Sequence, residues 1–153
     1  FNNIFVGEID ELSELGKVIF PTRYYSLRHF LRGEGFTSEY LSPGCENLHE
    51  VLSLQPKTRE FLFEFLQSYS LFLSVNEKHF SIVDRGKNVW PELIAEGIKK
   101  SIYMLAAILS NDVYAQKHNE KCILAIEEPD AGLHPALIKK IVEVIEQSKN
   151  IFL

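Results

Sequence analysis

The sequence contains only two cysteines, Cys45 and Cys122, and they lie far apart along the chain. Cys122 falls within an apolar run, so we expect two buried free thiols in a reducing cytosol rather than a disulfide. No apolar run approaches the roughly 20 residues that span a bilayer, and no signal-peptide pattern opens the chain. These absences predict a cytoplasmic protein that does not enter a membrane.

Basic residues are fewer than acidic ones: the chain has 16 Lys and Arg and 21 Asp and Glu, which gives a net charge of −5. Domains that bind nucleic acid over a broad surface usually carry a basic excess, so this charge argues against such a surface. It leaves open a local basic groove, or DNA contacts elsewhere. With 153 residues, of which 46% are hydrophobic, the chain is long enough for one domain with a core.

The phosphate-binding pattern GxxxxGK[ST] is absent from the sequence. Gly86-Lys87 comes nearest, but Ser81 stands where the pattern needs its first Gly, and Asn88 stands where it needs Ser or Thr. The 153 residues alone therefore supply no loop of this kind to hold the phosphates of a nucleotide.

Residues 121–135 read KCILAIEEPDAGLHP. The apolar residues 122–126 predict a strand buried on both faces, as in a parallel sheet covered by helices. Glu127 and Glu128 follow directly, and Pro129 prevents the strand from continuing its ladder. Ligands of open α/β sheets bind at the carboxyl edge, so this carboxylate pair suits a metal ion with a phosphate, or a water awaiting deprotonation. A strand that simply ends at a solvated turn is the alternative.

Residues 91–110 predict a helix with one apolar face, which carries Ile94, Ile98, Ile102, Leu105 and Leu109. Pro91 suits the first turn. Gly97 lies near the start, where Gly costs about 1 kcal/mol relative to Ala but lets an anion approach the free amides. Taken alone, this pattern is no more than a helix start.

The other elements are predicted from periodicity and turn residues. Before residue 60, we expect a strand at residues 17–20, a helix from Thr22 through Arg32, and helices over residues 46–54 and from Pro56. Arg23, Arg28 and Arg32 are expected on a solvated basic face, with phosphate contact as the alternative.

After the second of those helices, a hairpin is predicted from residues 71–75 and 79–83, followed by a turn at residues 84–88. Residues 111–120 are expected to form an exposed connection. A last helix runs from Pro135 to about Ser148, with an expected buried face of Leu137, Ile138, Ile141, Val142 and Ile145, and a strand begins near Asn150. The fold class is therefore α/β, a mostly parallel sheet with flanking helices and a peripheral hairpin.

Residues 123–135 resemble the Walker B and D-loop segment of ABC-type ATPase heads. The likeness is greatest to the branch of SMC-like proteins, RecF-like proteins and overcoming-lysogenization-defect (OLD) nucleases. That segment runs from four apolar residues through an acidic pair to Pro, an acidic residue, Ala, Gly or His, and Leu-His-Pro. Many ABC heads have Asp-Glu where this chain has Glu127-Glu128. Residues 95–100 (AEGIKK) are similar to the signature motif of the branch, with Ala95 in place of the usual Ser that contacts the γ-phosphate.

The resemblance implies ATP hydrolysis between the two heads of a homodimer, with ATP and Mg²⁺ as cofactors. Glu128 would be the general base that deprotonates water, and Glu127 would support Mg²⁺. The segment Ala95, Glu96 and Gly97 would contact the γ-phosphate that the opposing subunit holds. The D-loop would comprise Asp130, Ala131, Gly132, Leu133 and His134, and His134 is expected to cap the helix that begins at Pro135.

The resemblance also places the chain within a larger head. Residues 1–153 would be a partial ATPase domain, the C-terminal lobe of a P-loop NTPase, with the signature region at about 91–110 and the Walker B and D-loop at 122–135. We expect Walker A upstream of Phe1 and the switch histidine downstream of Leu153, so the 153 residues alone should be inactive. Relatives act in DNA repair, chromosome handling or anti-phage defence, often beside a nuclease domain, which makes DNA or a nuclease a candidate partner.

Two other interpretations remain open at this stage. The first is a catalytically silent ABC-like module that serves as a dimerisation or protein-interaction scaffold; Ala95 favours it, and the intact Glu128 argues against it. The second assigns the carboxylate pair to a metal nuclease. It needs further acidic ligands nearby, and only Asp130 is close in the sequence.

Overall fold

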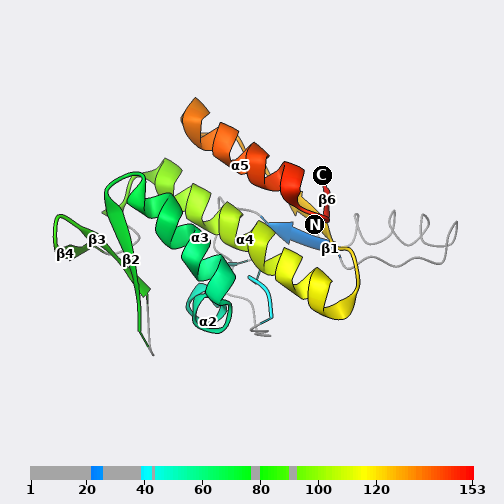
Figure 1. Ribbon diagram of the computed structural model, residues 1–153. Coiled ribbons are helices and arrows are strands. Elements are labelled where there is room, and N and C mark those ends of the chain that lie inside the picture. The colour runs from blue at the N-terminus through cyan, green and yellow to red at the C-terminus, as the bar shows by residue number, and fades with distance from the viewer. Residues whose placement is uncertain (1–21, 26–38, 43, 77–79, 90–92) are drawn as a thin grey trace, which may run out of the picture.

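The computed structural model describes residues 22–25, 39–42, 44–76, 80–89 and 93–153. These parts of the chain form two three-stranded sheets and four helices, which make a mixed α/β domain (Figure 1). The strand predicted at residues 17–20 and the positions of Arg28 and Arg32 lie outside the described residues.

The main sheet has the strand order β1-β5-β6 and is parallel throughout. It consists of β1 (Thr22–Tyr25), β5 (Ile123–Ile126) and β6 (Ile151–Phe152). The central strand β5 buries Leu124, Ala125 and Ile126. Consecutive buried residues are typical of a parallel strand covered on both faces, so the prediction for this stretch is confirmed.

The helix predicted to begin at Thr22 is wrong, because residues 22–25 form β1. The run Thr-Arg-Tyr-Tyr is rich in residues that favour strands, and each of the four pairs with a residue of β5. Arg23 is consequently only 7% exposed and does not lie on a solvated basic face.

Helix α4 (Glu96–His118) lies between α3 (Pro56–Gln67) and α5 (Pro135–Gln147), and the short helix α2 (Leu48–Leu54) packs beside α3 (Figure 1). The longest uninterrupted stretch of core residues belongs to α4 and runs from Met104 to Ile108. The predicted helices at 46–54 and from Pro56 are confirmed, with the first beginning two residues later than expected.

The end of α4 differs from the prediction. Residues 111–118 continue the helix instead of forming an exposed connection, and Asn111 and Ala115 are buried. No Gly or Pro lies between Gly97 and Asn119, so nothing in the sequence breaks the helix. Asn119 ends it in the left-handed conformation, with φ of 53°, a common role for Asn at this position.

Helix α5 buries Leu137, Ile141 and Val144. Val142 was predicted on this face but is 43% exposed. A helix covers its neighbours through a stripe of residues three and four apart, and the stripe through Leu137, Ile141 and Val144 leaves Val142 on the opposite side.

The second sheet is antiparallel, with the order β2-β3-β4. Its strands are β2 (Leu71–Val75), β3 (Phe80–Asp84) and β4 (Lys87–Val89). The hairpin is confirmed, and the turn predicted at 84–88 is itself a second hairpin: Arg85 and Gly86 both have positive φ, as a tight two-residue loop requires. None of the described helices is long and apolar enough to cross a membrane.

Candidate functional site

The two adjacent carboxylates lie where the main sheet ends. The backbone amide of Glu127 donates a hydrogen bond to the carbonyl oxygen of Tyr25 at 3.0 Å, which extends the pairing of β1 and β5 by one residue. All three strands are parallel, so their carboxyl ends share this edge. Glu127 is half-buried and Glu128 is exposed. The pair therefore occupies the edge at which open α/β sheets bind ligands.

The backbone of Glu128 is in the left-handed region, with φ of 44°. This conformation costs roughly 1–2 kcal/mol for a residue other than Gly, and such residues cluster at functional sites. The carbonyl oxygen of Glu128 accepts a hydrogen bond from the amide of Ala131 at 3.2 Å, and the Asp130 carbonyl accepts one from Leu133 at 3.1 Å. Residues 128–133 thus form two overlapping turns that lead from the sheet edge to α5.

Gly132 supplies the second left-handed position of this loop, with φ of 75°. The loop then ends at His134, whose Nδ1 accepts a hydrogen bond from the amide of Ala136 at 3.3 Å. His134 is therefore the N-cap of α5, as the sequence predicts, and it satisfies one of the amides that the first turn leaves without a helical partner.

The start of α4 packs directly on this loop. A Cβ atom at Gly97 would lie 3.3 Å from the carbonyl oxygen of Gly132 and 3.7 Å from Cδ2 of Leu133. The structure thus brings Gly97 and the loop together across a long stretch of sequence. This contact is a packing reason for Gly at position 97, because a larger side chain would collide with the loop. It is separate from the reason expected from the sequence, which is that Gly lets an anion come close to the helix amides.

The residues before Gly97 are more exposed. Ala95 is the N-cap of α4, and its methyl side chain makes no capping hydrogen bond. Glu96 forms an ion pair with Lys99 at 2.7 Å. The carbonyl oxygen of Ala95 accepts hydrogen bonds from the amides of Ile98 and Lys99, so the helical turn begins directly after Ala95.

Lys100 is a site residue to which sequence analysis gave no role. Its ammonium group donates hydrogen bonds to the carbonyl oxygens of Glu128, at 2.5 Å, and Ala131, at 2.9 Å. It lies three residues after Gly97, and residues three apart share a helix face. That spacing and its place at the end of the segment AEGIKK are the pointers in the sequence. Neither identifies the partners, because a hydrogen bond to a backbone oxygen leaves no pattern in the partner's side chains.

A buried polar cluster supports the strands behind the site. The guanidinium of Arg23 lies 3.5 Å from the ring centroid of Tyr40 and 4.4 Å from that of Tyr114. It donates hydrogen bonds to Oδ1 of Asn111 at 2.5 Å and Sγ of Cys122 at 2.7 Å. Paired and stacked in this way, a buried Arg joins β1 to α4 and to the residue before β5.

Tyr25 and Asn111 complete the cluster. The Nδ2 group of Asn111 donates hydrogen bonds to the Tyr25 hydroxyl at 2.8 Å and to the carbonyl oxygen of Ala107 at 2.7 Å, and the Tyr25 hydroxyl donates one to the Leu41 carbonyl at 2.6 Å. Burial raises the pKa of Tyr25 well above its ordinary value, so its hydroxyl stays protonated and can donate.

The donor set at the sheet edge fits a magnesium ion only in part. Mg²⁺ is commonly held by one or two carboxylates together with phosphate oxygens and water, and Glu127 and Glu128 can provide the carboxylates. Within the described residues, no three His, Cys, Asp or Glu side chains are gathered as a metal site. The arrangement therefore suits a metal that arrives with a phosphate, and nothing described supports the self-sufficient metal site of a nuclease.

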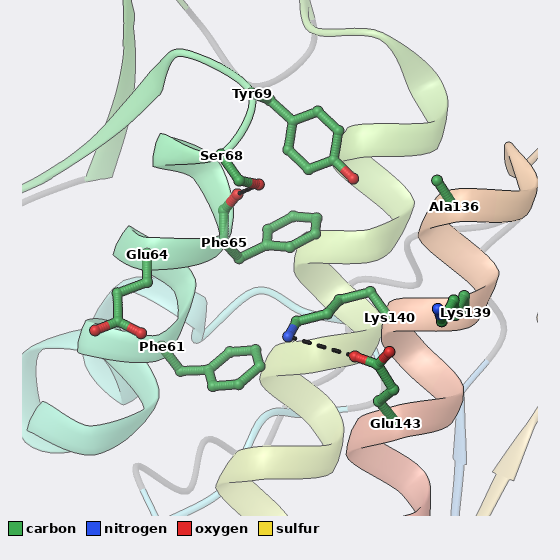
Figure 2. A pocket seen from close by; sticks show the side chains of 9 residues that line it. All are labelled: Phe61, Glu64, Phe65, Ser68, Tyr69, Ala136, Lys139, Lys140 and Glu143. Carbon is green, nitrogen blue, oxygen red and sulfur yellow. Dashed lines mark hydrogen bonds and ion pairs between the residues drawn. The ribbon is translucent and has the colours of Figure 1, made fainter.

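A surface hollow of about 370 Å³ lies elsewhere, between α3 and α5 (Figure 2). Its walls include Phe61 and Phe65 from α3, Tyr69 from the turn after α3, and Lys140 from α5. The Lys140 ammonium lies 5.6 Å from the ring centroid of Phe61 and 3.6 Å from the Glu143 carboxylate. Neither carboxylate of the sheet edge lines this hollow.

Comparison with protein families gives a match that covers almost the whole chain. Residues 10–151 match the family described as "AAA domain, putative AbiEii toxin, Type IV TA system". The chain belongs to this AAA domain family. It is accordingly an AAA/P-loop ATPase-type domain, and nucleotide binding and hydrolysis are the general activity of such domains. Neither curated proteins nor solved structures give a significant match.

Membership in the AAA domain family accounts for the architecture of the described residues. A parallel sheet flanked by helices, with functional groups at the carboxyl ends of its strands, is what a P-loop ATPase-type domain needs. The match does not distinguish an ABC-type branch from other branches of AAA domains, nor does it assign a role to any one residue.

Proposed function

We propose that this AAA domain is the Walker B lobe of an ABC-type ATPase head of the SMC, RecF and OLD branch, and that it hydrolyses ATP when a Walker A loop is present. The observation that carries the proposal is the position of Glu127 and Glu128 at the carboxyl edge of a parallel sheet, on a loop that packs against the start of a 23-residue helix at Gly97.

The roles of the residues follow from this placement. Glu128 would accept a proton from the attacking water, because an exposed carboxylate beside the phosphate site can act as a general base. Glu127, which is half-buried at the strand end, would support Mg²⁺. When bound, Mg²⁺ would neutralise developing charge on the phosphate oxygens. Ala95, Glu96 and Gly97 would face the γ-phosphate held by a second head.

The proposal includes a homodimer with ATP between its heads and a role in DNA processing or anti-phage defence. The Walker A loop, which these residues lack, would come from the rest of the polypeptide. The segment Asp130 to His134 would lie at the dimer interface as the D-loop. Its two turns and the His134 cap of α5 support this, since their hydrogen bonds give the loop a defined backbone path between the sheet edge and α5.

Replacing Glu128 with Gln tests the assignment, because Gln keeps the size and shape of the side chain but is not a base that can accept the proton. In the full-length polypeptide, E128Q should lower the rate of ATP hydrolysis by about 100-fold or more while ATP-dependent dimers still form. Steady-state phosphate release and size-exclusion chromatography measure the two effects. Glu143→Gln, on the exposed side of α5, is the matched control. Unchanged turnover in E128Q would remove Glu128 as the base.

A silent scaffold is the second candidate, and the exposed Ala95 N-cap is the observation that favours it. A scaffold would dimerise without hydrolysing ATP, so the wild-type turnover rate separates the two candidates directly. Absence of hydrolysis in a full-length polypeptide that contains a Walker A loop would favour the scaffold.

A further inference from the structure

We infer that Lys100 is a positioning residue for Glu128: it holds the loop that follows β5 so that the Glu128 carboxylate stands where hydrolysis needs it. This inference rests on the proposed function of Glu128. Its basis is a pair of hydrogen bonds from one ammonium group to the carbonyl oxygens of Glu128 and Ala131, at 2.5 Å and 2.9 Å.

The conformation of Glu128 shows why the loop needs such support. With φ of 44°, Glu128 occupies a region that residues with a side chain rarely adopt. A strained residue persists only when its surroundings determine its conformation. The Glu128 carbonyl oxygen has two donors, the amide of Ala131 and the ammonium of Lys100, and together they fix the peptide plane after Glu128.

Fixing that plane constrains the side chain. The direction of the Cα–Cβ bond of Glu128 follows from its backbone dihedrals, so a rotation of this peptide would move the carboxylate. Placement of reacting groups to within about 0.5 Å is what catalytic sites require. Through these two carbonyl oxygens, Lys100 therefore acts on the conformation of the loop that carries the proposed base.

The second contact of α4 with the loop makes the support rigid. One turn before Lys100, Gly97 packs against the carbonyl of Gly132. The carbonyl groups of residues 128, 131 and 132 thus all meet the first two turns of α4. Partial negative charge on carbonyl oxygens is favourable near a helix N-terminus, and the Lys100 ammonium adds a full positive charge there.

The test uses Lys100→Met and Lys100→Arg in the full-length polypeptide. Met keeps the length of the side chain but removes its donors, so kcat should fall about tenfold or more, because a charged hydrogen bond is lost. KM for ATP should stay within about twofold, since the proposed role of Lys100 is to hold the loop and not to bind ATP. Arg retains the charge and can donate to two oxygens, and it should restore most of kcat. Lys140→Met, which removes an ion-paired Lys from α5, is the matched control.

A second measurement follows the loop without any nucleotide. Hydrogen exchange read by mass spectrometry should show faster exchange in Lys100→Met at the amides of Ala131 and Leu133, which close the two turns. The amide of Glu127, bonded to β1, should keep its protection. Lys140→Met should match the wild type at all three.

The outcomes separate the two proposals. Normal kcat in Lys100→Met, with E128Q inactive, would overturn the role of Lys100 and leave the proposed function standing. Unchanged exchange of the loop in Lys100→Met would overturn it as well. A wild-type protein without ATP hydrolysis, or an E128Q variant with full turnover, would overturn the proposed function, and the catalytic role of Lys100 with it.

Discussion

Gly97 is where α4 comes closest to the loop after β5, and replacing it with Ala tests that contact. The new Cβ would lie 3.3 Å from the carbonyl oxygen of Gly132 and 3.4 Å from Cδ1 of Leu137. The contact with the Gly132 carbonyl oxygen is tighter than most contacts that Cβ atoms make in proteins. The Gly132 carbonyl is backbone, so the loop itself has to move by a few tenths of an ångström.

Two effects of the Gly97→Ala change oppose each other. Ala is favoured over Gly in a helix by up to about 1 kcal/mol, whereas overpacking typically costs about 1–3 kcal/mol. Lys100 holds the neighbouring carbonyl of Ala131, so the loop resists displacement. We therefore expect the free energy of unfolding to fall by about 0–2 kcal/mol, which lowers Tm by at most about 8 °C in a domain of this size.

Gly97→Asp adds charge to the same position. A carboxylate about 4 Å from a phosphate is repelled by roughly 4 kcal/mol near a protein surface, which corresponds to a loss of activity of about a thousandfold. Thermal unfolding by circular dichroism measures the steric effect, and steady-state ATP hydrolysis by the full-length polypeptide measures the electrostatic one.

Gly86→Ala serves as the contrast for both variants. Gly86 has open space around it but a φ of +76°, so Ala there should cost about 1 kcal/mol of stability through backbone strain and leave hydrolysis unchanged. A Gly97→Ala variant that gains stability would refute the packing argument. Undiminished hydrolysis in Gly97→Asp would refute the signature assignment.

Three further predictions concern other parts of the chain. Ala95→Ser should raise stability by about 1 kcal/mol, because Ser can cap α4 where Ala95 makes no capping bond; an unchanged Tm would contradict this, and a higher rate of hydrolysis would support the γ-phosphate role. Asn111→Ala should lower the free energy of unfolding, measured in urea, by about 2–4 kcal/mol, since it removes hydrogen-bond partners from the buried Arg23 and Tyr25. A loss below about 0.5 kcal/mol would show that the buried polar cluster around Arg23 contributes little to stability. Burial raises the pKa of Cys45 to about 12 from 9.0, so at pH 8 its thiolate fraction should be about a thousandfold lower than that of an exposed thiol. Labelling of Cys45 with a disulfide reagent should therefore require unfolding. Rapid labelling of the folded chain would contradict the burial.

The raised pKa of Cys45 also makes the free energy of unfolding depend on pH. Because folding raises the pKa of Cys45, the folded state holds this proton more tightly than the unfolded state. The stabilisation is fully present below the unfolded pKa of about 9 and is lost as pH rises toward the folded value. Stability should therefore decline in the alkaline range by less in Cys45→Ala than in the wild type.

Local patterns in the sequence were sufficient for much of the fold. Five consecutive apolar residues followed by Glu127, Glu128 and Pro129 predicted the central strand and its end correctly, because burial on both faces leaves no place for a polar side chain. The helix from Pro135 was predicted correctly with its His134 cap, since Pro at the first turn and a capping residue before it act within a few residues.

Errors arose where distant parts of the chain decide the outcome. Arg23 and Asn111 are polar, and each was predicted to be exposed; each is buried because the other is its partner, 88 residues away in the sequence. Local patterns predict a helix start where the structure has β1, because this strand depends on pairing with β5, which follows it by about a hundred residues.

For the candidate site, too, some features follow from local sequence and others depend on contacts between distant residues. The sequence alone pointed to the residues that we propose carry its chemistry: Glu127 and Glu128 at a strand end, and Gly97 at the start of a helix. Only the tertiary structure placed Gly97 against Gly132 and gave Lys100 its two carbonyl partners. The physical reason is that periodicity and turn chemistry depend on the types of neighbouring side chains, which the sequence gives directly. Every residue has backbone atoms that can form hydrogen bonds, so the sequence does not indicate which of them a distant side chain will contact, and only the packing of the chain decides it.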